Sequence, residues 1–209
     1  MTRAYWDSAH NEKYSTSSWA KKPSMFAEFC LPFLPKQGKI LDLGTGQGQD
    51  AVFFHKLGYE VVGIDYSEQA VASAKAHYPN IKFIKADIAN GLPFKDQEFD
   101  VVYSHLALHY FDHRTTEKIF KDIHRILKPN GVVATLTNTV EDPELKLNGY
   151  IKLETDFYQT PEGIQKRYFS IASIEAVAHR LFSTLIADSH GETYKDEIKT
   201  LIRFIGKKI

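Results

Sequence analysis

The sequence contains very little cysteine: Cys30 is the single one among 209 residues. One thiol can form neither an internal disulfide nor a thiolate metal cage, so we expect Cys30 to pack as a small apolar side chain. Long hydrophobic runs are also missing, and residues 1–7 lack the apolar core of a signal peptide. These absences favour a cytoplasmic protein that does not partner a membrane.

An excess of charge of one sign is missing as well. The 26 Lys and Arg residues balance the 26 Asp and Glu residues, and the formal net charge is +0. Such a chain has no overall field that attracts nucleic acid, so nucleic acid is a disfavoured partner. The length and a hydrophobic content of 43% suit a single domain over residues 1–209 with its own core.

What is present is a glycine-rich turn that follows a short apolar run. Gly44, Gly46 and Gly48 alternate along this turn, and Asp42 precedes the first of them by two residues. Glycines permit backbone angles closed to other residues and let a ligand approach the main chain. A dinucleotide-binding fingerprint, G-x-G-x-x-G, would need a glycine at position 49, where this sequence has Gln49. The P-loop motif is also absent. The motif that the sequence does contain is D-x-G-x-G-x-G. An ordinary strand-to-helix turn is the plain alternative.

Apolar runs alternate with helical patterns through most of the chain. The runs predict strands at residues 39–43, 60–65, 81–88, 99–104 and 132–136. This alternation favours a parallel, doubly wound sheet, whose ligands lie at the carboxyl ends of the strands. Asp65, Asp87 and Ser104 fall at such ends, as does the glycine turn. A helix at 172–181 and two strands at 184–187 and 200–205 predict an antiparallel ending, whereas residues 140–170 look irregular.

These motifs resemble those of the class I (Rossmann-like) S-adenosylmethionine (SAM) dependent methyltransferases. The resemblance rests on D-x-G-x-G-x-G, on Asp65 about 20 residues beyond the turn, and on the order of elements. It implies an α/β fold: a doubly wound, seven-stranded, mostly parallel sheet with an antiparallel C-terminal strand and helices on both faces. It also implies an enzyme whose cofactor is SAM and whose product is S-adenosylhomocysteine (SAH).

The same resemblance implies a set of cofactor-binding residues. These are Asp42, Gly44, Gly46 and Gly48 near the methionine and ribose, Asp65 at the ribose hydroxyls, Tyr66, Asp87 and Ile88 around the adenine, and Ser104 beside the methionine portion. An aromatic ring face attracts the cationic sulfonium, and Trp6 is our candidate for that contact. Simple packing would explain Trp6 equally well.

The acceptor side is less strongly specified. Residues 5–7, 23–27 and 106–109 resemble the branch of the family that methylates small molecules, and residues 104–107 lack the Asn-Pro-Pro-aromatic element of many nucleic-acid and protein methyltransferases. We expect an N-terminal arm and helix at 1–36 and a substrate-side cap at 140–170. RNA or protein methylation and a noncatalytic SAM-binding or scaffold role are the alternatives. The glycine spacing disfavours a nicotinamide-dependent oxidoreductase.

Three histidines recur at every fourth residue, His105, His109 and His113. They would form a metal-binding stripe on a continuous helix, but they follow a strand end and no carboxylate or thiolate completes the set, so we predict no metal. His105 or His109 is a candidate general base near the acceptor. In the cap, Arg167 is suited to pair with an anionic acceptor, although a surface arginine near Glu162 explains it too.

Overall fold

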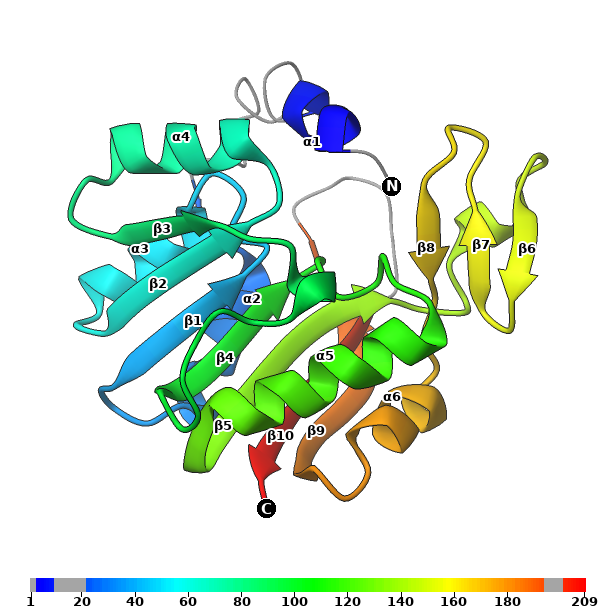
Figure 1. Cartoon of the computed structure of the whole chain (residues 1–209). Coiled ribbons are helices and arrows are strands. Elements are labelled where there is room, and N and C mark those ends of the chain that lie inside the picture. Colours follow the sequence, from blue (N-terminus) through cyan, green and yellow to red (C-terminus); the bar gives the residue numbers. More distant parts are fainter. Residues whose placement is uncertain (1–2, 10–21, 194–200) are drawn as a thin grey trace.

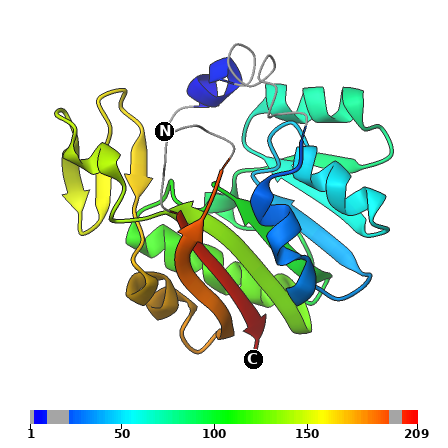
Figure 2. The ribbon, with the colours of Figure 1, turned by 180° about the vertical axis from the view of Figure 1, so that it is seen from behind.

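The computed structural model describes residues 3–9, 22–193 and 201–209. A seven-stranded sheet in the order β3-β2-β1-β4-β5-β10-β9 forms the centre, with helices on both faces (Figures 1 and 2). Its strands are β1 (Lys39–Leu43), β2 (Glu60–Asp65), β3 (Lys82–Lys85), β4 (Phe99–His105), β5 (Leu127–Asn138), β9 (Phe182–Gly191) and β10 (Leu201–Lys208). Strands β1 to β5 pair in parallel, whereas β10 is antiparallel to both β5 and β9. The predicted fold class is confirmed.

The helices sort onto the two faces of the sheet. Buried residues of α2 (Met25–Cys30), α3 (Gln49–Lys56) and α4 (Glu68–His77) share one hydrophobic cluster, and those of α5 (His113–Ile126) and α6 (Ile171–Ala178) share the other. Neighbouring strand residues alternate between the clusters, because successive side chains of a strand point to opposite faces. The other helical segments are α1 (Arg3–Ala9), η3 (Leu31–Phe33), η4 (Ile88–Asn90) and η5 (Pro143–Lys146).

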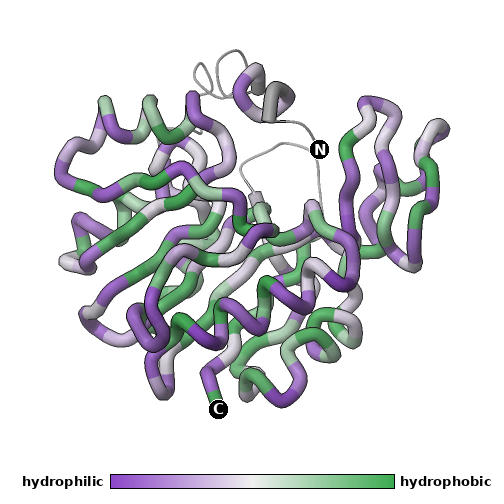
Figure 3. Tube along the Cα trace, in the orientation of Figure 1, coloured by the Kyte–Doolittle hydropathy of each residue, from purple (hydrophilic) through white to green (hydrophobic). Residues whose placement is uncertain are grey.

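Amphipathic periodicity explains how α5 lies on the sheet. Ile119, Phe120, Ile123 and Ile126 are buried on one side of it, and Figure 3 shows hydrophilic and hydrophobic stretches alternating along this helix. The Asp112 side chain caps its start. None of the helices in the described part of the chain has both the length and the apolar character that a membrane span needs.

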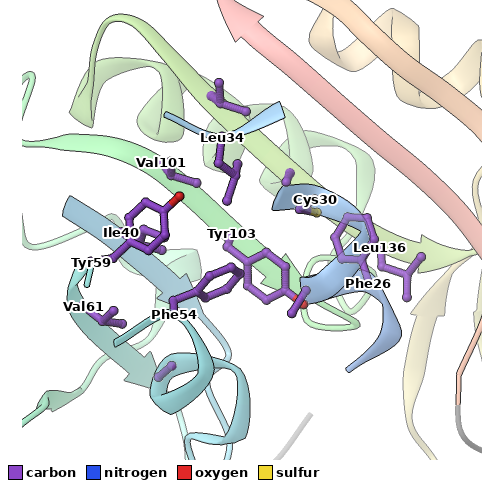
Figure 4. Packing of buried hydrophobic residues seen from close by; sticks show 14 of the residues in the cluster. Phe26, Cys30, Leu34, Ile40, Phe54, Tyr59, Val61, Val101, Tyr103 and Leu136 are labelled. Atoms are coloured by element: carbon purple, nitrogen blue, oxygen red, sulfur yellow. The ribbon is translucent and has the colours of Figure 1, made fainter. Parts of the chain in front are cut away.

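Aromatic side chains fill the core on the other face. Tyr103 of β4 packs between Phe26, with ring centroids 5.5 Å apart, and Phe54, at 5.0 Å (Figure 4). Cys30 is fully buried in the same cluster, as its sequence context predicted, and burial raises the pKa of its thiol. This packing joins α2, α3 and β4 beneath the glycine turn.

Several sequence-based boundaries were wrong. Residues 140–170 are not irregular but contain a three-stranded antiparallel sheet of β6 (Ile151–Glu154), β7 (Phe157–Gln159) and β8 (Gln165–Arg167). Strands of three or four residues are too short to show a clear alternation. Strand β5 begins at Leu127, five residues before the predicted start, and continues through the Lys-Pro-Asn-Gly sequence that predicted a turn. Of the predicted arm at 1–36, the described residues contain α1, α2 and η3.

Candidate active site

A cavity of about 500 Å³ opens at the carboxyl ends of β1, β2 and β4. This volume is within the range of small-molecule sites. Figure 1 shows α1 and the small sheet β6–β8 flanking this edge of the main sheet. Its described lining includes ten of the twelve predicted site residues: Trp6, Asp42, Gly44, Gly46, Asp65, Tyr66, Asp87, Ile88, His105 and His109.

The glycine turn has the backbone geometry that its sequence predicted. Gly44 and Gly46 have positive φ angles of 73° and 54°. A Cβ on Gly44 would lie 2.2 Å from the Cβ of Ala107, so glycine is required there by both angle and space. The N–H of Gly44 donates to the Ile64 carbonyl at 2.8 Å, which fastens the turn to the end of β2.

Asp65 connects this turn to the next helix. One carboxylate oxygen accepts from the Gly46 N–H at 2.9 Å, and the other accepts from the Ser67 N–H at 2.8 Å. Ser67 in turn caps α4 by accepting from the Ala70 N–H at 3.1 Å. The carboxylate therefore has a fixed orientation at the cavity wall, with Tyr66 beside it.

Asp87 is fixed in a similar way. Its two oxygens accept from the Ala89 N–H at 3.0 Å and from the Asn90 side-chain amide at 2.9 Å, so the residue caps the short helix η4. Asp87, Ile88 and Ala89 all line the cavity. A carboxylate has about four lone-pair sites, so these contacts leave room for a ligand donor.

Two buried carboxyl groups, those of Asp42 and Asp50, line the cavity. Asp42 is buried and accepts from the Thr45 hydroxyl at 2.6 Å. Burial, followed by the negative charge of Asp50, raises the pKa of Asp42 to about 8. A cationic ligand would lower that pKa, because a nearby positive charge favours the ionised carboxylate. The site is therefore chemically suited to a positively charged group.

Asp50 was missed by the sequence analysis. Its buried carboxylate accepts from the Ser24 N–H at 2.6 Å, from the Ser24 hydroxyl at 2.8 Å and from the Tyr103 hydroxyl at 2.8 Å. Ser24 and Asp50 both line the cavity. The available signals were the position of Asp50 directly after the glycine turn and that of Ser24 as a helix N-cap.

Two predicted site residues do not line the cavity. Ser104 is buried, and its hydroxyl donates to the Leu43 carbonyl at 3.1 Å, which ties β4 to β1. Gly48, with φ 87°, is the N-cap of α3 and packs against the Phe83 ring. Both residues hold the site together from outside its wall.

Trp6 reaches the cavity because α1 is fastened above it. The Asp7 carboxylate accepts from the Ser67 hydroxyl at 2.7 Å, which holds α1 on the start of α4. The Trp6 ring meets Tyr110 edge to face, with centroids 4.9 Å apart. Aromatic surface from Trp6 and Tyr110 therefore forms part of the cavity lining.

The histidines do not form a metal-binding stripe. His105 ends β4, His109 lies in the following loop and His113 begins α5, where its imidazole is exposed beside Glu117. His105 and His109 line the cavity, whereas His113 does not. The described ranges contain no group of three residues able to hold a metal ion.

Arg167 has a structural role, which corrects both sequence-based alternatives. Its side chain is only 8% exposed and donates to Glu154 at 2.7 Å. It also donates to the carbonyls of Phe111 at 3.0 Å and Thr155 at 3.3 Å. A buried guanidinium needs such partners, so Arg167 anchors the cap and is not available to an acceptor.

Comparison with known proteins places these features in context. Residues 40–131 match the model of a family described as "Methyltransferase domain". The chain is 38% identical over 96 residues to an uncharacterized methyltransferase of Synechocystis, a match covering 46% of this chain and 45% of that protein. It is 37% identical over 97 residues to the demethylmenaquinone methyltransferase of Chlorobaculum tepidum, covering 46% and 39%. The matches thus span less than half the length of these curated relatives.

A solved structure shares the fold over nearly the whole chain. The 1,6-didemethyltoxoflavin-N1-methyltransferase of Burkholderia thailandensis, crystallised with 1,6-didemethyltoxoflavin and S-adenosylhomocysteine, has a TM-score of 0.75. Its sequence identity is 15%, and the match covers 99% of this chain and 86% of that one. At this identity the likeness concerns the fold alone.

Proposed function

We propose that the chain is a class I SAM-dependent methyltransferase, which its match over residues 40–131 to a methyltransferase domain supports, and that it transfers the methyl group of SAM to a small-molecule acceptor by in-line displacement. The observation that carries the proposal is the cavity, whose lining combines acids and glycines with aromatic and histidine side chains. When bound, SAM supplies an electrophilic methyl on a cationic sulfonium. The protein has to position two reactants and exclude water.

The acids and glycines that line the cavity fit the chemistry of SAM. Asp42 lies in the cavity lining, where a ligand ammonium would stabilise its ionised form. The turn at Gly44 and Gly46 presents main chain with no Cβ, and the oriented carboxylates of Asp65 and Asp87 can accept from hydroxyl and amino groups. We propose these roles for the residues that the resemblance implied.

A small acceptor fits better than nucleic acid. The described lining contains five aspartates and two lysines, a balance that repels phosphates. A relative that is 37% identical has a small-molecule substrate by name, demethylmenaquinone. The alternative of another class, a noncatalytic SAM-binding or scaffold protein, would bind SAM without transferring its methyl group.

We propose His105 or His109 as a general base for acceptors that must lose a proton. Both imidazoles line the cavity beside Tyr110 and Phe111, and histidine titrates near neutral pH. His105→Ala or His109→Ala should then lower turnover while SAM affinity stays nearly intact. Loss of SAM binding in both variants would argue against the role.

The first test is calorimetric titration with SAM, SAH and NADH of the wild type and of Asp65→Ala. We expect micromolar binding of both sulfur ligands, weakened by the substitution, and no comparable binding of NADH. Methyl transfer from radiolabelled SAM to a panel of small acceptors follows. Failure to bind SAM and SAH, or preference for NADH, would overturn the proposal, and binding without transfer to any acceptor would favour the noncatalytic alternative.

A further inference from the structure

The cavity lining contains a lysine that is paired with a carboxylate. Lys166 of β8 lines the cavity, and its Nζ lies 3.0 Å and 3.2 Å from the two carboxylate oxygens of Glu144. The two side chains are only 17% and 14% exposed. Glu144 also accepts from the Tyr168 hydroxyl at 2.7 Å and from the Asn138 amide at 3.3 Å.

Lys166 therefore offers the cavity a hydrogen-bond donor, while the carboxylate of Glu144 balances its positive charge. An ammonium has three N–H groups, and two suffice for Glu144, so one can point to a ligand. Glu144 does not line the cavity, whereas Lys166 and Asn138 do. Tyr168 stays neutral, because burial and its bond to Glu144 raise its pKa. The cluster therefore presents an N–H donor that suits a neutral oxygen.

Aromatic and amide side chains also line the cavity. Trp6, Tyr110 and Phe111 contribute ring surface, and Asn138 and Gln165 contribute amides. Among the described lining residues the other cation is Lys22, which lies two residues from Ser24 on the Asp50 side. A carboxylate or phosphate placed beside Lys166 would thus lose its hydration next to a cation whose charge Glu144 already balances.

Resting on the proposed function, we infer that the acceptor is an uncharged planar ring compound with a carbonyl oxygen that accepts from Lys166. Stacking on the aromatic wall stabilises such a ring, and the Lys166 donor fixes its orientation. Glu144 is then a specificity-determining residue. Because its carboxylate pairs with the Lys166 ammonium and balances its charge, it excludes anionic acceptors. The relevant property of the site is the pairing of these two residues, not the lysine alone.

The test compares two probes that share a bicyclic ring. Wild-type protein saturated with SAH is titrated calorimetrically with 4-quinolone, which is neutral and has a carbonyl, and with quinoline-4-carboxylate, which is anionic. We expect 4-quinolone to bind at least about tenfold more tightly, because the lysine that the carboxylate would meet is already paired with Glu144. Equal or tighter binding of the carboxylate, or no binding of 4-quinolone to the SAH complex, would overturn the inference.

Two variants test the pair itself. Glu144→Gln leaves Lys166 charged but unmatched, so affinity for quinoline-4-carboxylate should rise about tenfold. Lys166→Met should weaken 4-quinolone about tenfold, and Lys152→Met, an exposed lysine of β6 outside the cavity, should change neither probe. Unchanged affinity of the folded Glu144→Gln protein for the carboxylate would contradict the inference, as would unchanged binding of 4-quinolone by Lys166→Met.

Binding of SAH distinguishes failure of the proposed function from failure of the acceptor inference. A wild type that does not bind SAH fails the proposed function, and the acceptor inference falls with it. A wild type that binds SAH but prefers the anionic ring fails the acceptor inference alone. If Glu144→Gln does not fold, the wild-type probe comparison still tests whether an uncharged ring is preferred, and Lys166→Met still tests the contact with the lysine.

Discussion

Gly44 is the residue at which backbone angle and packing coincide most closely. Its φ is 73°, and an added Cβ would lie 2.2 Å from that of Ala107. Gly58 also has a positive φ, 94°, but no atom lies within 4 Å of its added Cβ. We expect Gly58→Ala to cost about 1–2 kcal/mol of unfolding free energy from backbone strain, and Gly44→Ala about 2–5 kcal/mol because the clash adds to it.

Urea unfolding of both variants measures this difference, and calorimetry with SAM adds a second readout. Gly44→Ala should also weaken SAM binding, since Gly44 lines the cavity and Gly58 does not. Equal losses of stability in the two variants would show that Ala107 moves aside at little cost.

Asp42 gives a prediction about pH. Burial raises its pKa from the ordinary 3.8 to about 8 in the folded protein. Between these values the folded state holds a proton that the unfolded state has released, so this group makes the unfolding free energy fall as pH rises from about 4 to about 8. Asp42→Asn removes that contribution.

The measurement is urea unfolding without ligand at pH 5.5 and pH 8 for the wild type and Asp42→Asn. The loss of stability on going to pH 8 should be smaller in the variant, because other titrating groups contribute equally to both proteins. A variant that loses as much as the wild type would mean that Asp42 is ionised at neutral pH in the folded state.

Among the secondary-structure elements, α2 depends on a polar anchor inside an apolar core. The Tyr103 hydroxyl donates to the buried Asp50 carboxylate, which also holds Ser24 at the start of α2. Tyr103→Phe should lower the unfolding free energy by about 1.5–3 kcal/mol, because it removes a hydrogen bond to a charged group and leaves that group buried.

Tyr59→Phe is the matched control for Tyr103→Phe. The Tyr59 hydroxyl donates to a neutral acceptor, the Pro35 carbonyl, at 2.6 Å. Its loss should cost only about 0.5–1.5 kcal/mol. Thermal or urea unfolding compares the two, and a larger effect of Tyr59→Phe would contradict the importance we assign to the Asp50 anchor.

At the scale of the whole molecule, the two hydrophobic clusters lie on opposite faces of one sheet. Neighbouring residues of the same strand, such as Ile40 and Leu41, belong to different clusters, so neither face can unfold and leave the other intact. We therefore predict one cooperative transition, in keeping with a single domain over 1–209. Far-UV circular dichroism and intrinsic fluorescence should give the same midpoint, and separated midpoints would indicate two units.

The sequence by itself determined the fold class and most of the acids and glycines that line the cavity. Apolar runs with the period of a strand, and the glycines that follow Asp42, are local signals that act over a few residues. Parallel strands bring their carboxyl ends to one edge, so Asp65 and Asp87 were predicted to meet the glycine turn, and the structure places them in one cavity. The binding roles of these residues stay predictions.

Only the tertiary structure decided which side chains face the cavity and which partners they have. Ser104 follows the strand pattern yet turns to the Leu43 carbonyl, and Arg167 is buried against Glu154. Asp50 and Ser24 meet across 26 residues of sequence. Such contacts depend on how separate elements pack, and no local periodicity encodes them. For the same reason the pairing of Lys166 with Glu144 became visible only in the folded chain.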